Sequence, residues 1–273
     1  MPAAYTHYRF GKDVLECLPF VYKKPIKKYR ELFDIGLHGP DILFYYKPLS
    51  SNPVSQSGFA MHDKPGTEFF EKACEIYKSL NNPDTLKAYL YGFICHFALD
   101  STCHPYIEKM TSESGIDHNE IETELDRYFM RKDRIQPSKY IPVQHIHPRI
   151  EAGIIISPCF DSVTPENIAD ALKDMIRVHK LLHVSGNGKR KCLYLALKLL
   201  GKYDSVQGLI MKPETKDICQ KYCILLNKLY TEAVTVAASL IQQYAGVLDH
   251  EGTLPSRFAQ TFGAGEKWEE LFI

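Results

Sequence analysis

Three polar residues follow one another at four-residue intervals within an otherwise apolar stretch: His96, Asp100 and His104. Residues four apart lie on the same face of an α-helix, so the two imidazoles and the carboxylate form one stripe. Burying such groups is costly unless a partner compensates them. A divalent metal ion is the simplest partner that all three can share. Nitrogen and oxygen ligands suit Zn²⁺, with Mn²⁺ or Fe²⁺ as alternatives.

A second pair of candidate ligands has the same spacing. His118 and Glu122 lie four residues apart in a stretch that opens with Asp117, a residue suited to a helix N-cap. We expect the first helix to end near His104, because a proline follows it, and the connection 106–116 to let the two helices pack antiparallel. The alternative is a helix pair with hydrogen-bonded polar residues. Five ligand-type residues in two registered helices favour the metal site.

Three more candidates lie earlier in the chain. His7 stands among aromatic residues near the N-terminus. Asp41 follows a Gly-Pro turn and enters an apolar segment, where a carboxylate is either an N-cap or a ligand that points into the core, and His38 is close enough to compete with it. His62 ends an apolar island in residues 47–65, a Pro-, Ser- and Asn-rich stretch that predicts a long loop.

Other histidines have ligand-like spacing without a carboxylate beside them. His179 and His183 are four residues apart on a predicted helix, next to basic residues that indicate a solvated end. His145 and His147 lie in a proline-rich segment that is typical of surface chain. We therefore expect these four histidines to bind no metal.

The elements that must position the candidates are helical. Apolar residues recur at helical intervals and no segment alternates at period two, so we expect an all-α fold in which residues 1–273 form a single domain. Helices are predicted at 66–82, 86–101, 117–132, 164–183, 188–202 and 215–246. The proline-containing stretch 133–163 predicts an irregular crossing segment, and the tail after His250 is expected to wrap the surface.

Charge and composition narrow the class of protein. Lys+Arg and Asp+Glu are both 33, which removes the electrostatic case for a nucleic-acid scaffold but not for an enzyme that acts on nucleic acid. No apolar run approaches the length expected of a membrane span, so no transmembrane segment is predicted. The N-terminus lacks a basic region followed by an apolar one, so we expect no signal peptide and a cytoplasmic location.

The ordered set of candidates resembles the zinc-dependent phospholipase C family, whose helical fold is shared with the S1/P1-type nucleases. The resemblance covers roughly the first half of the chain and rests on His7, Asp41, His62, His96, Asp100, His104, His118 and Glu122. It implies a cluster of two or three zinc ions. One ion would take Asp41, His62, His96 and Asp100, a second would take His7 with Asp100 as a bridge, and a third would take His104, His118 and Glu122.

The chain departs from that family in two places. The family's secreted enzymes use a processed N-terminal Trp as a ligand beside the early His, whereas the only Trp here is Trp268. They also place the next His six residues after the bridging Asp, whereas His104 follows Asp100 by four. These departures bear on the His7 site and on the geometry of the third site.

The chemistry of such a cluster suits phosphodiester hydrolysis, because divalent ions activate a water and neutralise charge on a phosphate under in-line attack. The first hypothesis is a hydrolase of phospholipase C type that acts on a phosphodiester carrying a phospholipid head group, with Asp41 orienting or deprotonating the water. One alternative is an S1/P1-like nuclease or nucleotidase, in which Tyr45 or Tyr46 would stack a base. The other is a non-catalytic metal-binding homologue.

Overall fold

The computed structural model describes residues 3–80, 83–250 and 252–273, and these residues contain helices and no β-strand. The predicted all-α fold is confirmed. The α-helices are α1 (Ala4–Cys17), α2 (Phe20–Lys28), α3 (Arg30–Gly36), α4 (Pro53–His62), α5 (Gly66–Ser79), α6 (Pro83–Ser114), α7 (His118–Lys132), α8 (Ile150–Ile156), α9 (Pro165–Leu182), α10 (Asn187–Leu199), α11 (Tyr203–Val206) and α12 (Asp217–Asp249). Short 3-10 helices are η1 (Gly39–Tyr45), η2 (Pro137–Lys139), η3 (Ser157–Cys159), η4 (Gln207–Leu209), η5 (Ser256–Ala259) and η6 (Trp268–Glu270).

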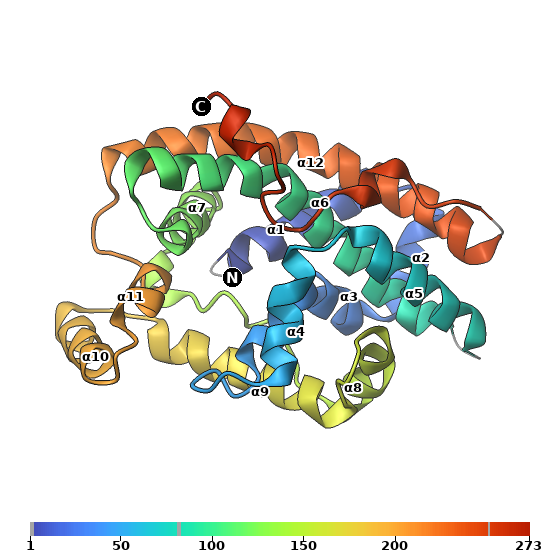
Figure 1. Ribbon diagram of the computed structural model, residues 1–273, viewed down its shortest axis with the longest axis horizontal. Coiled ribbons are helices and arrows are strands. Elements are labelled where there is room, and N and C mark those ends of the chain that lie inside the picture. Colours follow the sequence, from blue (N-terminus) through green and yellow to red (C-terminus); the bar gives the residue numbers. More distant parts are fainter. Residues whose placement is uncertain (1–2, 81–82, 251) are drawn as a thin grey trace.

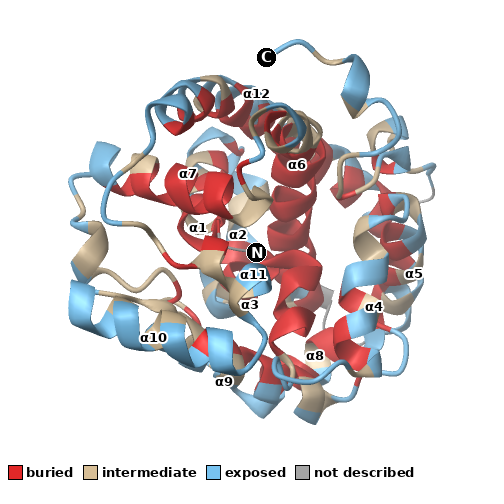
Figure 2. Cartoon of the chain, turned by 60° about the vertical axis from the view of Figure 1, so that its left-hand side comes forward, coloured by how far each residue is buried: buried red, intermediate tan, exposed pale blue. Residues whose placement is uncertain are grey.

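Helix α6 is the central element. It packs against α3 on one side and α12 on another, and it is buried along most of its length (Figures 1 and 2). Its approach to α3 depends on two facing glycines, Gly92 and Gly36, because a side chain on Gly92 would clash with the carbonyl of Phe33. The helix that carries the histidine stripe is therefore held rigidly within the core.

Helix α12 corresponds to the helix predicted at 215–246, but it is more apolar than expected. It has 33 residues, and an 18-residue window with a mean hydropathy of 1.3 makes it long and apolar enough to cross a membrane by length and composition alone. The expectation that no apolar run approaches that length is therefore wrong. In this fold α12 packs against α6, α1 and α7, as the core helix of a helical protein does.

Residues 47–65 do not form the predicted loop. They contain α4, whose start is fixed by a capping box: the Asn52 side chain accepts a hydrogen bond from the Ser55 amide (3.0 Å), and Pro53 occupies the first helical turn. Composition indicated a loop because these residues also favour turns. Consequently His62 lies in the last turn of a helix and not on a free segment.

Helix α6 also continues where it was expected to end. It passes through Pro105 and reaches Ser114, because its packing in the core offsets the missing backbone hydrogen bond. The connection to α7 is only residues 115–117, with Gly115 at a φ of 65°. In two views α7 crosses α6 steeply instead of running antiparallel to it (Figures 1 and 2). His96, Asp100 and His104 thus share one unbroken helical face.

The C-terminal tail does more than wrap the surface. Phe258 and Phe262 are fully buried and pack against Phe70 and Phe97 of α5 and α6. Residues 256–265, which we call the C-terminal strap, therefore belong to the core beside the histidine stripe. The expectation of a purely superficial tail is wrong.

Candidate metal centre

All eight candidate ligands converge between α1, η1, α4, α6 and α7. Their ligand atoms fall into three groups, and within each group they lie within 4.8 Å of one another. The groups are His7 with His96 and Asp100, Asp41 with His62 and His96, and His104 with His118 and Glu122. Residues far apart in the sequence are thus assembled into one centre.

The separations suit ligands of a common ion. The two oxygens of Asp100 face different histidines, at 3.2 Å from His7 Nε2 and 2.9 Å from His96 Nε2. Asp41 Oδ1 lies 3.1 Å from His62 Nε2 and 3.9 Å from His96 Nε2. Ligands at about 2.0–2.1 Å from a tetrahedral zinc ion are about 3.3 Å apart. The buried His96 Nε2 atom has no hydrogen-bond partner, as expected of a nitrogen that serves as a metal ligand.

The third group is linked to the other two through His104. Its Nε2 atom lies 3.4 Å from Glu122 Oε1 and 3.7 Å from Asp100 Oδ1, and His118 Nε2 lies 3.6 Å from Glu122 Oε2. Because α6 continues past His104, four-residue spacing from Asp100 still brings this histidine to α7. His7 also reaches Asp100 without a neighbouring tryptophan, so both departures from the family pattern leave the groups assembled.

The carboxylates of the centre are buried and ionised. Burial raises the pKa of Asp41, Asp100 and Glu122, but each pKa is held below its usual range, and the facing imidazoles contribute to this lowering. Burial lowers the pKa of His7, as does the neighbouring His96, so its imidazole is neutral and keeps a lone pair. Buried anions together with a neutral imidazole form the donor set that Zn²⁺ requires.

Three of the histidines are oriented by main-chain carbonyls. In each, Nδ1 lies within hydrogen-bond distance of a carbonyl oxygen: His104 with Phe262 (2.7 Å), His62 with Gly58 (3.0 Å) and His96 with Leu37 (3.3 Å). A carbonyl can only accept, so Nδ1 donates to it, and Nε2, which faces the carboxylates, is the nitrogen that would bind a metal ion. Metal-binding histidines are commonly fixed in this way.

The C-terminal strap holds two of these histidines from different helices. The Phe262 carbonyl accepts from His104, and the Gly263 amide donates to the carbonyl of His62 (2.8 Å). Sequence reasoning missed this contribution, because a main-chain contact leaves no residue-type signal beyond the apolar Phe258 and Phe262.

Asp126 positions His7 from a distance in sequence. Its carboxylate accepts hydrogen bonds from the Tyr5 amide (3.1 Å), the Thr6 amide (2.8 Å) and the Thr6 hydroxyl (2.7 Å). The cap residue of α1, Ala3, offers no side-chain acceptor, so this carboxylate of α7 caps α1 in its place. The available signal was the continued four-residue spacing from Glu122.

The four histidines expected to bind no metal lie outside the three groups found among the described residues. His145 Nε2 is 2.8 Å from His38 Nε2, and burial lowers the pKa of His145 to about 3. His179 pairs with the Tyr45 hydroxyl (3.0 Å), and burial lowers its pKa to about 4. His183 donates to the carbonyl of Ser138 (2.9 Å), and His147 is exposed.

Comparison with known proteins bears on the whole centre. The family described as zinc dependent phospholipase C matches residues 6–177, a span that contains all eight candidate ligands. No curated protein and no solved structure matches the chain.

Proposed function

The chain belongs to the zinc-dependent phospholipase C family, and from this premise we propose that it is a metal-dependent phosphodiester hydrolase that acts on a phospholipid-type substrate. The observation that carries the proposal is the set of three histidine–carboxylate groups. His96 belongs to two of these groups, and Asp100 contacts both His7 and His96. Shared ligands of this kind would bring ions close together, as in two-metal sites that stabilise the attacking and leaving oxygens of a phosphodiester.

We assign the eight converging residues as ligands of two or three Zn²⁺ ions, with Asp100 shared between two of them. Bound ions would stabilise charge on the phosphoryl oxygens and activate a water for attack. The protein orients the imidazoles through Nδ1 and keeps the carboxylates ionised. Most of the ligands are buried, but the side chains of His62 and His118 are 18% and 31% exposed, so the phosphate would enter at this edge.

Asp41 is our candidate for the general base. Its carboxylate follows the Gly-Pro turn at the start of η1 and is directed at His62 and His96. The N-cap position of η1 falls on His38, which favours the ligand interpretation of Asp41 over the cap. Because its pKa is held below the usual range, the carboxylate is ionised at neutral pH, so its oxygens can accept a hydrogen bond from a water and orient it.

The nuclease alternative finds less support. Tyr45, one of the two tyrosines considered for base stacking, is only 4% exposed, and its hydroxyl is engaged with His179. A stacking platform needs an accessible ring face. We therefore place phospholipid-type diesters ahead of nucleic acid as substrates.

The test combines metal analysis with a substrate panel. Purified protein should contain zinc and hydrolyse phospholipids in detergent micelles, and a chelator should abolish turnover until zinc is restored. Single-stranded DNA and a nucleotide diester serve as comparison substrates. Zinc binding without hydrolysis of any diester would favour the non-catalytic alternative, and faster cleavage of DNA than of phospholipid would favour the nuclease.

A further inference from the structure

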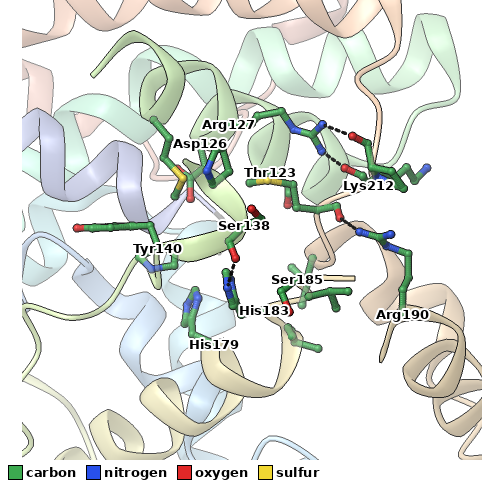
Figure 3. A pocket seen from close by; sticks show the side chains of 18 of the residues that line it. Thr123, Asp126, Arg127, Ser138, Tyr140, His179, His183, Ser185, Arg190 and Lys212 are labelled. Atoms are coloured by element: carbon green, nitrogen blue, oxygen red, sulfur yellow. Dashed lines mark hydrogen bonds between the residues drawn. The ribbon is translucent and has the colours of Figure 1, made fainter. Parts of the chain in front are cut away.

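A cavity of about 350 Å³ lies beside the metal centre (Figure 3). Two elements contribute to both sites: Tyr45 follows Asp41 by four residues on η1, and Asp126 follows Glu122 by four on α7. Four residues advance a helix by about 6–8 Å, so the cavity begins about one turn from the centre. Its other walls come from residues 137–142, the end of α9, the start of α10 and residues 209–213. Much of this wall lies beyond the part of the chain that the family matches.

The charged groups of the cavity are predominantly basic: Arg127, Arg131, Arg190 and Lys212. Glu124 pairs with Arg127 (3.0 Å) and Glu120 pairs with Lys212 (2.6 Å). In the described chain, no carboxylate forms an ion pair with Arg131 or Arg190, although Glu124 lies near enough to Arg131 for their charges to interact. The acidic side chain in the lining, Asp126, is already occupied by the first amides of α1.

The guanidinium groups are close enough to influence one another. Burial lowers the pKa of Arg127; Glu124 raises it, and the charges of Arg131 and Arg190 lower it further. Three guanidinium groups that repel one another are a typical arrangement for binding an anion.

Two donors in this cluster are unsatisfied. Arg127 is only 3% exposed, and its terminal nitrogens donate to the carbonyls of Lys212 and Pro213, but its buried Nε has no partner. Arg190 donates to Asn187 and to the carbonyl of Met211, and its buried Nε also has no partner. Unpaired buried donors are costly, so the protein itself does not fully compensate this cluster of guanidinium groups.

We propose that this cavity binds a second anionic group of the substrate, so that the preferred phosphodiester carries a phosphorylated head group. The inference rests on the proposed function and specifies its substrate class. A quaternary ammonium head group would meet arginines here and would be disfavoured. Met130, Leu182 and Met211 provide apolar wall for the carbon frame between the two anionic groups.

The test uses two soluble probes that differ by one phosphate: myo-inositol 1,4-bisphosphate and myo-inositol 1-phosphate. Calorimetric titration of the zinc-loaded protein should show at least tenfold tighter binding of the bisphosphate. Arg190→Gln should reduce this preference severalfold, and Arg131→Gln/Arg190→Gln should abolish it. The matched control is Lys228→Gln, which removes an exposed cation of α12 and should leave the preference unchanged.

Three results would overturn the inference: equal affinity for the two probes, a preference that survives in the double variant, or the same preference in metal-depleted protein. The last would indicate a free-anion site that is independent of the metal centre. Failure of the proposed function is recognised separately. Diester hydrolysis without the arginine-dependent preference contradicts only the cavity assignment, whereas the preference without any hydrolysis contradicts only the proposed function.

Discussion

Glu122 and Asp126 lie one turn apart on the same face of α7, yet their surroundings give them opposite properties. Glu122 lies between His104 and His118; burial raises its pKa, but the charge of His118 and hydrogen bonds from both imidazoles contribute to holding it well below the usual range. Asp126 faces amides and a hydroxyl, and burial raises its pKa to about 7. A carboxylate therefore becomes a candidate ligand through the imidazoles that face it, and residue type alone does not decide its role.

The histidines of the metal centre and those of the neighbouring cavity show the same contrast. Those of the centre face carboxylate oxygens, whereas His179 and His183, at the cavity, bond a phenol and a main-chain carbonyl. His179 and His183 have the same four-residue spacing as His96 and Asp100. Spacing brings such groups onto one helical face, but the partner supplied by another element determines whether an ion can be held.

The largest effect is expected from Asp100→Ala, because this carboxylate faces histidines of two groups. We expect the loss of more than one zinc equivalent and of detectable hydrolysis, measured by elemental analysis and a diester assay. Asp170→Ala, at an exposed position on α9, is the control. Unchanged zinc content in Asp100→Ala would contradict the shared role.

Asp41→Asn separates the effect of charge from that of shape at a second carboxylate of the centre. The amide keeps one ligand oxygen but loses the basicity, so most of the zinc should remain while the rate falls by about a hundredfold or more, as expected for loss of a general base. Rate and zinc content are measured on the same preparation. A fully active variant would leave the base unassigned.

Gly263→Pro tests the C-terminal strap. Proline removes the amide that donates to the carbonyl of His62, and disturbance of groups that orient ligands typically weakens metal binding by about 10–100-fold. We expect about a tenfold loss of zinc affinity in a competition titration with a chelator. Gly263→Ala keeps the amide and should lose less, although its Cβ would lie 3.1 Å from the His62 carbonyl. Equal affinity in wild type and Gly263→Pro would show that the strap does not support the centre.

Asp126→Asn should reveal the raised pKa of the Asp126 carboxyl group, which caps α1. The folded pKa of about 7 exceeds the unfolded value of about 3.9, so stability from the protonated carboxyl is fully present below pH 4 and lost as the pH rises to 7. The asparagine does not titrate. The free energy of unfolding of Asp126→Asn relative to wild type should therefore increase between pH 4 and 7, measured by urea unfolding. A constant difference would contradict the shift.

The smallest effects are expected from His179→Ala and His183→Ala. Neither side chain faces a carboxylate of the centre, so zinc content should stay within experimental scatter of the wild-type value. Loss of a full zinc equivalent in His179→Ala would show that the histidines of the cavity also bind metal, which contradicts the contrast with those of the centre.

Sequence reasoning predicted the all-α fold, and four-residue spacing selected the candidate ligands of α6 and α7, because it reports directly on a helical face. His7, Asp41 and His62 were selected through the family resemblance, and the structure brings all eight residues together. Sequence reasoning failed at α4, where Asn52 caps a helix in a segment whose Pro, Ser and Asn residues had indicated a loop. It also failed at Pro105, where packing in the core lets α6 continue through a residue that usually ends a helix. It could not find the strap, the cap by Asp126 or the arginine cavity. Each of these depends on contacts between distant segments that leave no local pattern. The boundaries of the single domain, the relation to S1/P1-type nucleases and the cytoplasmic location stay predictions.

The central claim is that the converging histidines and carboxylates hold zinc. Anomalous diffraction at the zinc absorption edge, on crystals of the zinc-loaded protein, tests it most directly. We expect two or three peaks, with one at about 2.0–2.2 Å from both His96 Nε2 and an oxygen of Asp100, and another between His104, His118 and Glu122. A zinc peak at His179 and His183 with none at Asp100 would contradict the account.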